Sequence, residues 1–170
     1  MNRSSEDMQR LMDRFRDVIR GAGVKMTAQR IAIYREAART ADHPNIEEIF
    51  KTVRRTMPTV SLDTVYRTLD LFKALGLVSI LRPLPDRIRI DANTEPHHHF
   101  VCTSCGAIRD FRGPGLDGLK IPEAAGRLGR AQSARLELLG VCADCSKSGK
   151  SHGPDGMRSH RIKAGNSRRD

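Results

Sequence analysis

The 170-residue sequence has little aromatic surface and no long apolar run. It contains no Trp, and aromatic residues make up 4% of the chain. We therefore expect two modest cores, one of them reinforced by a metal, because small domains bury little surface on folding. No stretch approaches the roughly 20 apolar residues of a transmembrane helix. The N-terminal residues MNRSSEDMQR lack the apolar segment of a signal peptide. These absences predict a cytoplasmic protein with no membrane partner.

Cysteine is also scarce, and its spacing is informative. The chain has four Cys, which form two Cys-x-x-Cys pairs: Cys102 with Cys105, and Cys142 with Cys145. In a reducing compartment, thiols bind metals more often than they form disulfides. Two pairs with no Cys left over supply the four thiolates of a tetrahedral zinc site. We therefore predict structural Zn(2+), with a redox-active dithiol as the alternative.

Acidic residues are outnumbered by basic ones. The sequence has 30 Lys and Arg against 20 Asp and Glu, which gives a formal net charge of +10. This balance favours a polyanionic partner, with nucleic acid ahead of an anionic membrane surface. Residues 147–170 contain seven Lys or Arg and two Asp among Gly and Ser. We interpret this segment as a basic disordered tail.

Hydrophobic periodicity predicts four helices in the first half of the chain. They cover residues 6–20, 27–40, 45–56 and 61–75. Thr27, Asn45 and Ser61 are suited to cap the last three helices. Two strands are then expected, at Leu77–Leu81 and Arg87–Asp91. This order predicts a winged helix-turn-helix whose fourth helix enters the DNA major groove.

The pattern changes after residue 92. We interpret Asn93–Pro96 as a hinge, followed by strands at Phe100–Cys102, Ile108–Phe111 and Arg135–Val141 and by a weak helix at 115–129. The expected fold class is α+β. The expected domains are a winged-helix DNA-binding domain at 1–92, a hinge at 93–96, a small zinc-stapled α/β dimerisation domain at 97–146 and the tail at 147–170.

Several motifs in a fixed order carry a resemblance to a known family. They are VKMTAQR at 24–30, His43-Pro44, TVYRTL at 64–69, GLV at 76–78, HHH at 97–99, CTSCG at 102–106, Asp110-Phe111 and GVCADC at 140–145. Together they resemble the ferric uptake regulator (Fur) family of bacterial metal-dependent repressors. The resemblance implies a homodimer that binds a double-stranded DNA operator, an A/T-rich pseudo-palindrome.

A second metal site is expected from nitrogen and oxygen ligands. Its candidate ligands are His43, Asp91, His97, His99 and Asp110. On an extended segment His97 and His99 point the same way, whereas His98 points away. Three imidazoles and two carboxylates suit Fe(2+), Mn(2+) or Zn(2+). The five residues match the regulatory metal site of the peroxide-sensing branch of the family. The alternatives are a helix-boundary role for His43 and an incidental run of histidines.

Asp110 favours the peroxide-sensing branch, because iron-sensing members usually carry Glu at this position. The resemblance implies that Fe(2+)-dependent oxidation of His43 and His97 weakens metal binding and releases the DNA. This chemistry is self-oxidation without turnover, so we do not expect an enzyme. An iron-responsive or zinc-responsive uptake repressor is the alternative within the same class.

The resemblance also implies which residues contact DNA. They are Lys25, Arg30, Ser61, Thr64, Tyr66 and Arg67. Arg67 can pair with guanine, and the Tyr66 ring can pack on thymine methyl groups. Lys25 suits a narrow A/T-rich minor groove. The alternatives are a core position for Tyr66 and a solvated surface position for Arg67.

An enzyme is the rival from another class. A His-x-His pair with two Asp resembles a hydrolytic metal site, and Cys-x-x-Cys occurs in oxidoreductases. However, five protein ligands leave little space for a substrate and an activated water. Neither Cys-x-x-Cys pair opens a helix in a βαβ pattern. We therefore expect binding rather than turnover.

Overall fold

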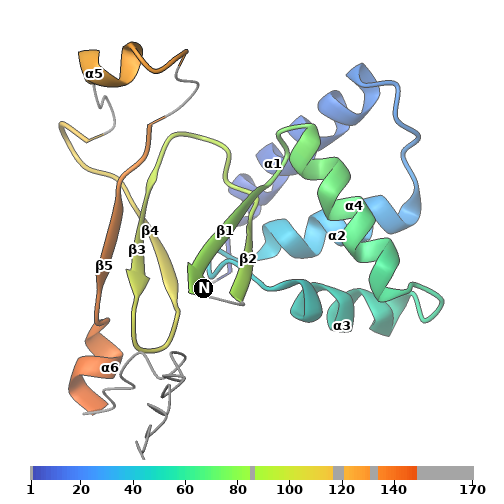
Figure 1. Cartoon of the computed structure of the whole chain (residues 1–170). Helices are drawn as coiled ribbons and strands as arrows, with labels where there is room; N and C mark the ends of the chain where they lie inside the picture. Colours follow the sequence, from blue (N-terminus) through green and yellow to red (C-terminus); the bar gives the residue numbers. More distant parts are fainter. Residues whose placement is uncertain (1, 85–86, 117–120, 131–133, 149–170) are drawn as a thin grey trace, which may run out of the picture.

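The computed structural model describes residues 2–84, 87–116, 121–130 and 134–148. In Figure 1 a helical N-terminal half stands beside a C-terminal half built on a narrow sheet. The N-terminal half consists of α1 (Ser5–Gly21), α2 (Ala28–Arg39), α3 (Ile46–Thr56), α4 (Leu62–Ala74), β1 (Ser79–Leu84) and β2 (Arg87–Asp91). The C-terminal half consists of β3 (His98–Cys102), β4 (Ile108–Phe111), α5 (Glu123–Gly126), β5 (Glu137–Gly140) and α6 (Ala143–Ser148).

The expected helix caps are present in the structure. The side chain of Thr27 accepts a hydrogen bond from the Arg30 amide at the start of α2. Asn45 and Glu48 form a reciprocal capping box at α3. Such caps satisfy amides that have no partner inside the helix. The α4 helix is followed by Gly76, whose φ of 66° lies in the left-handed region that favours glycine. The expected α+β class is confirmed.

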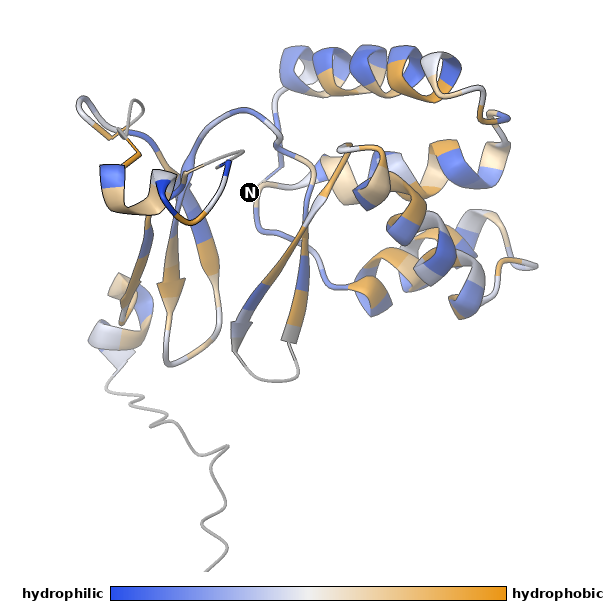
Figure 2. Cartoon of the chain, turned by 45° about the horizontal axis from the view of Figure 1, so that its top comes forward, coloured by the Kyte–Doolittle hydropathy of each residue, from blue (hydrophilic) through white to orange (hydrophobic). Residues whose placement is uncertain are grey.

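Three aromatic rings organise the core of the N-terminal half. Phe15 of α1 stacks on Tyr34 of α2 with ring centroids 4.4 Å apart, and Phe72 of α4 meets both rings edge-on. All three side chains are fully buried. Figure 2 shows the hydrophobic residues concentrated on the sides of the helices that face one another. Three of the seven aromatic residues of the chain therefore join α1, α2 and α4.

The C-terminal sheet has the strand order β4-β3-β5. Strand β3 pairs antiparallel with β4 and parallel with β5. The β5 strand lies close to the ring of Phe100, since a Cβ atom on Gly140 would be 3.1 Å from that ring. Only Leu81, Val101 and Ile108 form a buried apolar cluster there among the described residues. This half therefore has very little hydrophobic core of its own.

Some element boundaries differ from the expectations. Strand β1 begins at Ser79 rather than Leu77, because Leu77 is buried in the helical core. The weak helix expected at 115–129 is reduced, within the described residues, to the single turn α5, which buries no residue. The short helix α6 was not expected. The expected tail lies mostly outside the described residues, and its first two residues belong to α6. No described helix is long and apolar enough to span a membrane.

Candidate metal centres

The four cysteines converge at one end of the C-terminal sheet. Cys102 ends β3, Cys105 lies in the following turn, and Cys142 and Cys145 lie just before and within α6. Their sulfur atoms all lie within 4.8 Å of one another, and Cys105 Sγ is 3.9 Å from Cys142 Sγ. Zinc–sulfur bonds of about 2.3 Å in a tetrahedron separate the sulfurs by about 3.8 Å. The chemistry and spacing of this cluster therefore fit a zinc ion.

Backbone amides prepare one of these thiols to bind a cation. The amides of Cys105 and Cys142 point at Cys102 Sγ from 3.4 and 3.3 Å. Burial opposes ionisation of this thiol, but these hydrogen bonds outweigh it and lower the pKa of Cys102 to about 6. A thiolate is the form that binds metals. Cys102 is therefore arranged as an ionised ligand near neutral pH.

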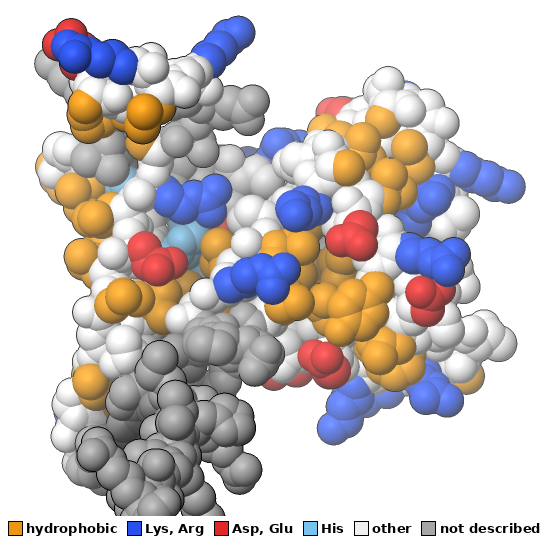
Figure 3. Space-filling model, in the orientation of Figure 1, with side chains coloured by type: hydrophobic (Ala, Val, Ile, Leu, Met, Phe, Trp, Pro, Cys, Tyr) orange, Lys and Arg blue, Asp and Glu red, His pale blue; other side chains and the backbone are white. Residues whose placement is uncertain are grey.

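A second cluster lies between the two halves. The ligand atoms of His43, Asp91, His97 and His99 all lie within 4.8 Å of one another, and all four residues are buried. His43 comes from the α2–α3 connection and Asp91 from the end of β2. His97 immediately precedes β3, and His99 lies within it. His97 Nε2 is 2.8 Å from His99 Nε2 and 3.1 Å from Asp91 Oδ2. In Figure 3 histidine atoms are visible between the two halves.

Asp110 of β4 completes this cluster. Its Oδ1 lies 2.9 Å from His43 Nε2 and 3.6 Å from Nε2 of both His97 and His99. Asp110 Oδ1 and His43 Nε2 are both buried, and neither has a hydrogen-bond partner of suitable geometry in the described part of the chain. Buried polar atoms without partners are costly. A divalent cation among these atoms would satisfy them, so the five residues fit a metal with nitrogen and oxygen ligands.

The hydrogen bonds of the ring nitrogens determine which histidines are available. His97 Nδ1 donates to the carbonyl of Glu95 at 2.7 Å, which leaves Nε2 directed at the cluster. His98 faces the other way, as expected. Its Nδ1 accepts from the Leu136 amide at 3.1 Å, and its ring packs near Phe111. His98 therefore connects β3 to the segment before β5 and does not join the cluster.

Electrostatic coupling holds the acidic groups of the cluster ionised. Burial favours the neutral form of Asp91, but contacts with His97 and His99 hold its pKa far below its usual range. Burial likewise opposes protonation of His97, yet Asp91 and the Glu95 carbonyl raise the pKa of His97. A raised pKa favours a proton on His97 when no metal is bound, and this proton would offset part of the negative charge of the carboxylates. Metal binding through His97 would release this proton.

His43 has an unusual backbone conformation. Its φ is 53°, and it is the only described residue other than Gly with a positive φ. A ring-bearing side chain in the left-handed region costs energy and persists only where its surroundings hold it. Here the Ile90 amide donates to the Pro44 carbonyl at 2.9 Å, and Arg89 donates to the His43 carbonyl at 3.4 Å. Strand β2 therefore holds the His43 loop in place.

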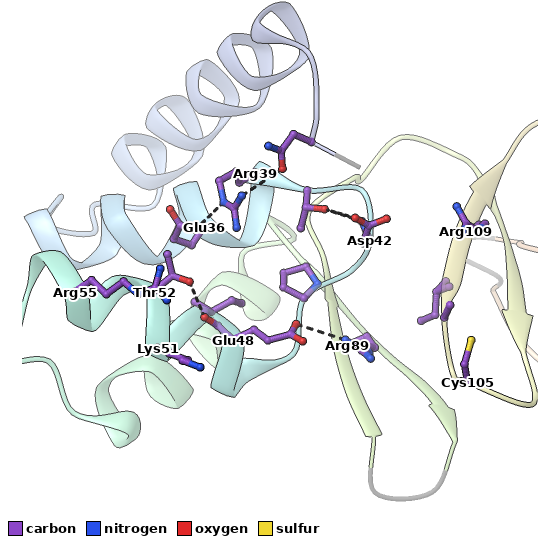
Figure 4. Close-up of a pocket in the computed structure, with 16 residues that line it drawn as sticks. Glu36, Arg39, Asp42, Glu48, Lys51, Thr52, Arg55, Arg89, Cys105 and Arg109 are labelled. Carbon is purple, nitrogen blue, oxygen red and sulfur yellow. Dashed lines mark hydrogen bonds and ion pairs between the residues drawn. The ribbon is translucent and has the colours of Figure 1, made fainter. Parts of the chain in front are cut away.

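A polar cleft of about 640 Å³ lies beside the second cluster. Figure 4 shows Arg89 and its ion-pair partner Glu48 on the wall formed by the N-terminal half, with Cys105 and Arg109 on the opposite wall. No histidine is among the residues that line this cleft. The two walls belong to different halves, so a change in the angle between the halves would change the width of the cleft.

The expected DNA-contacting residues lie at the solvent-facing side of the N-terminal half. Tyr66 of α4 is 39% exposed, so the core position is wrong for this residue. The Arg67 side chain is 81% exposed and pairs with Asp63 at 2.9 Å. Ser61 Oγ caps α4 by accepting from the Thr64 amide at 3.1 Å, and the two hydroxyls lie 2.9 Å apart. The Arg30 guanidinium donates to the carbonyl of Lys25.

The sequence predicts only a hinge role for Asn93 and Glu95. In the structure both residues make hydrogen bonds to ligand residues of the second cluster. The signal was present in part, since an Asn two residues after a candidate ligand can form a turn with its own backbone.

Comparisons with known proteins agree with this architecture. The profile of the ferric uptake regulator family matches residues 21–138. The chain therefore belongs to the ferric uptake regulator family.

Particular relatives refine the comparison. The chain is 36% identical over 131 residues to the peroxide operon regulator of Bacillus subtilis (strain 168), with 77% of this chain and 90% of the relative covered. A solved structure of a zinc-bound manganese uptake regulator is 31% identical, with a TM-score of 0.56 and coverage of 75% of this chain and 97% of that one. A zinc uptake regulator complexed with zinc and DNA shares the fold, with a TM-score of 0.62 at 20% identity and coverage of 86% and 99%.

Proposed function

We propose that the protein is a metal-dependent, DNA-binding transcriptional repressor that senses peroxide. The observation that carries this proposal is the convergence of five ligand residues from both halves of the chain. His43 and Asp91 belong to the elements that carry the DNA-reading helix, whereas His97, His99 and Asp110 belong to the C-terminal sheet. Occupancy of this cluster therefore fixes the orientation of one half relative to the other. The likeness to the Bacillus subtilis peroxide operon regulator supports the peroxide-sensing branch.

The regulatory site would take Fe(2+) or Mn(2+), and the cysteine cluster would hold Zn(2+). Fe(2+) held by the residues of the regulatory site would supply the redox chemistry by which H2O2 oxidises a ligand ring. In the net reaction one oxygen atom of H2O2 enters a C–H bond of an imidazole and the other leaves as water. The rings of His43 and His97 are the proposed targets. A ligand ring changed in this way binds metal poorly, so the two halves separate and the DNA is released.

The proposed domains are the DNA-binding domain 1–92, the hinge 93–96 and the dimerisation domain 97–146. Exposed apolar side chains support pairing of two copies through the second domain. Leu138, Leu139 and Val141 lie on or beside β5 and are 45–65% exposed. Strand β5 is itself an edge strand of the described sheet. A homodimer would cover this surface and place two reading helices on a pseudo-palindromic operator.

In the proposed DNA interface, Tyr66 and Arg67 of α4 read bases, while Lys25, Arg30, Ser61 and Thr64 contact the grooves or the backbone. Removing a base-reading Arg should cost about 1–3 kcal/mol and relax the sequence preference. We expect Arg67→Ala to broaden the set of operators bound in a selection from random DNA. Lys51→Ala is the matched control, because Lys51 is an exposed cation of α3 on the cleft side. An Arg67→Ala protein with unchanged preference would contradict base reading.

The peroxide-sensing role is tested on protein purified without oxygen and loaded with Fe(2+). After micromolar H2O2, we expect +16 Da on His43 or His97 and loss of the operator complex. Protein loaded with Mn(2+) is the control and should keep both its mass and its DNA. Fe(2+)-loaded protein with unmodified histidines after peroxide would reject peroxide sensing and favour an iron- or zinc-responsive repressor.

The enzyme alternative requires turnover rather than one modification per chain. A mobility shift with and without Mn(2+) separates the two classes, since only a repressor is expected to bind the operator in a metal-dependent way. Equal operator binding in both conditions would argue against the proposed repressor.

A further inference from the structure

Asn93 occupies a central position in the hinge beside the regulatory cluster. It is half-buried, and it makes three hydrogen bonds. Its backbone amide donates to Asp91 Oδ1 at 2.7 Å. Its side-chain Nδ2 donates to Asp110 Oδ2 at 3.4 Å, and its Oδ1 accepts from the Glu95 amide at 3.3 Å. One residue thus contacts both carboxylates of the cluster.

The hydrogen bond from Asn93 gives the two carboxylate oxygens of Asp110 different partners. Oδ1 faces the Nε2 atoms of His43, His97 and His99 at 2.9–3.6 Å. Oδ2 is held on the other side by Asn93 Nδ2. A carboxylate held in this way offers one oxygen to a cation instead of two. One coordination position is therefore left open for a small ligand such as peroxide.

The second contact extends to a histidine. The hydrogen bond from the Glu95 amide to Asn93 Oδ1 closes a turn of the kind that Asn side chains often form. The carbonyl of Glu95 in turn accepts the hydrogen bond from His97 Nδ1 at 2.7 Å. This carbonyl directs His97 Nε2 toward the cluster. Partners of ligands in this second layer commonly influence metal affinity or activity about 10–100-fold.

We propose that Asn93 is a positioning residue that keeps Asp110 a one-oxygen ligand and so preserves the open position at the regulatory site. This inference rests on the proposed peroxide-sensing function. It assigns to the hinge a role in reactivity in addition to its role as a connection between domains.

Two variants distinguish the hydrogen bond that Asn93 Nδ2 donates to Asp110 from the turn that Asn93 Oδ1 closes with the Glu95 amide. Asn93→Ala removes both side-chain hydrogen bonds. Asn93→Ser keeps a hydroxyl that can accept from the Glu95 amide, but it is too short to reach Asp110. Thr94→Ala is the matched control, because the Thr94 side chain makes no hydrogen bond within the described residues. If Asn93 acts through Asp110, both Asn93 variants should behave alike and differ from the control.

The first readout is the rate of +16 Da formation per bound Fe(2+), measured at saturating metal. We expect a fall of about tenfold in Asn93→Ala and Asn93→Ser and no change in Thr94→Ala. Asn93→Ser with wild-type rates would overturn the proposal, because the turn alone would then suffice.

The second readout does not involve peroxide. Difference infrared spectra between Mn(2+)-loaded and metal-free protein, labelled with 13C-aspartate, report how ligand carboxylates bind the cation. We expect the wild-type protein to show one-oxygen coordination and both Asn93 variants to show an added two-oxygen band. Identical spectra would overturn the proposal. If wild-type protein is not oxidised at all, the peroxide function fails, while these spectra still decide the role of Asn93.

Discussion

The N-terminal half buries 18 apolar residues in one cluster, whereas the cluster at the C-terminal sheet has three, one of which comes from the β1 strand of the other half. The first half is stabilised by the burial of side chains around Phe15, Tyr34 and Phe72. The second half instead relies on two clusters that together contain nine ligand residues. Two of these residues, His43 and Asp91, come from the first half. Apolar burial and metal coordination thus divide the stabilisation of one chain between its two halves.

This difference separates the two tasks of the proposed repressor. A half with a full core keeps its shape when the metal changes, so the reading helix α4 stays presented to DNA. A half with little core depends on its ligands, which makes its arrangement responsive to metal and oxidation.

Loss of the cysteine cluster should have the largest effect. Structural zinc can contribute on the order of 10 kcal/mol to folding. We expect Cys142→Ser to abolish zinc binding and unfold the C-terminal half, while the α1–α4 signals remain in a 1H–15N spectrum of the full chain. Asp144→Asn, in the same loop, is the control and should retain zinc, since Asp144 makes only an exposed ion pair with Arg109. A folded C-terminal half without zinc would contradict the comparison.

Truncation of the aromatic core should destabilise the other half. Phe72→Ala should lower the free energy of unfolding of the N-terminal half by about 3–5 kcal/mol, because it leaves a cavity under Phe15 and Tyr34. Thermal unfolding followed by circular dichroism should show the loss, and zinc content should stay at the wild-type value. Phe72→Leu should cost less. Zinc loss in Phe72→Ala would show that the halves do not behave separately.

Alkaline pH should weaken the same core by a smaller amount. Burial raises the pKa of Tyr34 to about 12, against the opposing influence of Arg14 and Arg3. The unfolded chain, with a Tyr pKa near 10, loses this proton first. Stability is therefore fully present below pH 10 and falls as the pH rises toward 12, by about 1.4 kcal/mol for each unit. Tyr34→Phe should flatten the decline in denaturant midpoint between pH 9 and 11.

The exposed Tyr66 provides the control for this pH dependence. Tyr66→Phe should leave the slope of stability against pH unchanged. An equal slope in Tyr34→Phe and wild-type protein would mean that other groups, such as lysines, determine the alkaline decline.

Local signals in the sequence predicted the N-terminal half well. The caps at Thr27 and Asn45 and the helical spacing of apolar residues are short-range features, and the structure contains them. The cysteine cluster followed from ligand chemistry and spacing. The segment between β4 and β5 was less predictable, because α5 buries no residue and no apolar pattern specifies its extent.

The metal cluster was predictable as a set of ligand types but not as a geometry. The alternation of side chains along an extended segment correctly predicted that His97 and His99 face the cluster and that His98 faces away from it. The left-handed conformation of His43 and the contacts of Asn93 depend on how β2 and the hinge pack against distant segments. Such long-range packing leaves no local periodicity, so the role of the hinge became visible only in three dimensions.

The parallel pairing of β3 and β5 also bears on how the chain folds during synthesis. Helices α1–α4 and the β1–β2 hairpin have all been synthesised once residue 91 has emerged from the ribosome. Strand β5 can join β3 only after residues 137–140 have been made, more than forty residues later. Each new molecule can therefore form its proposed DNA-reading surface before the part that we propose makes that surface dependent on metal.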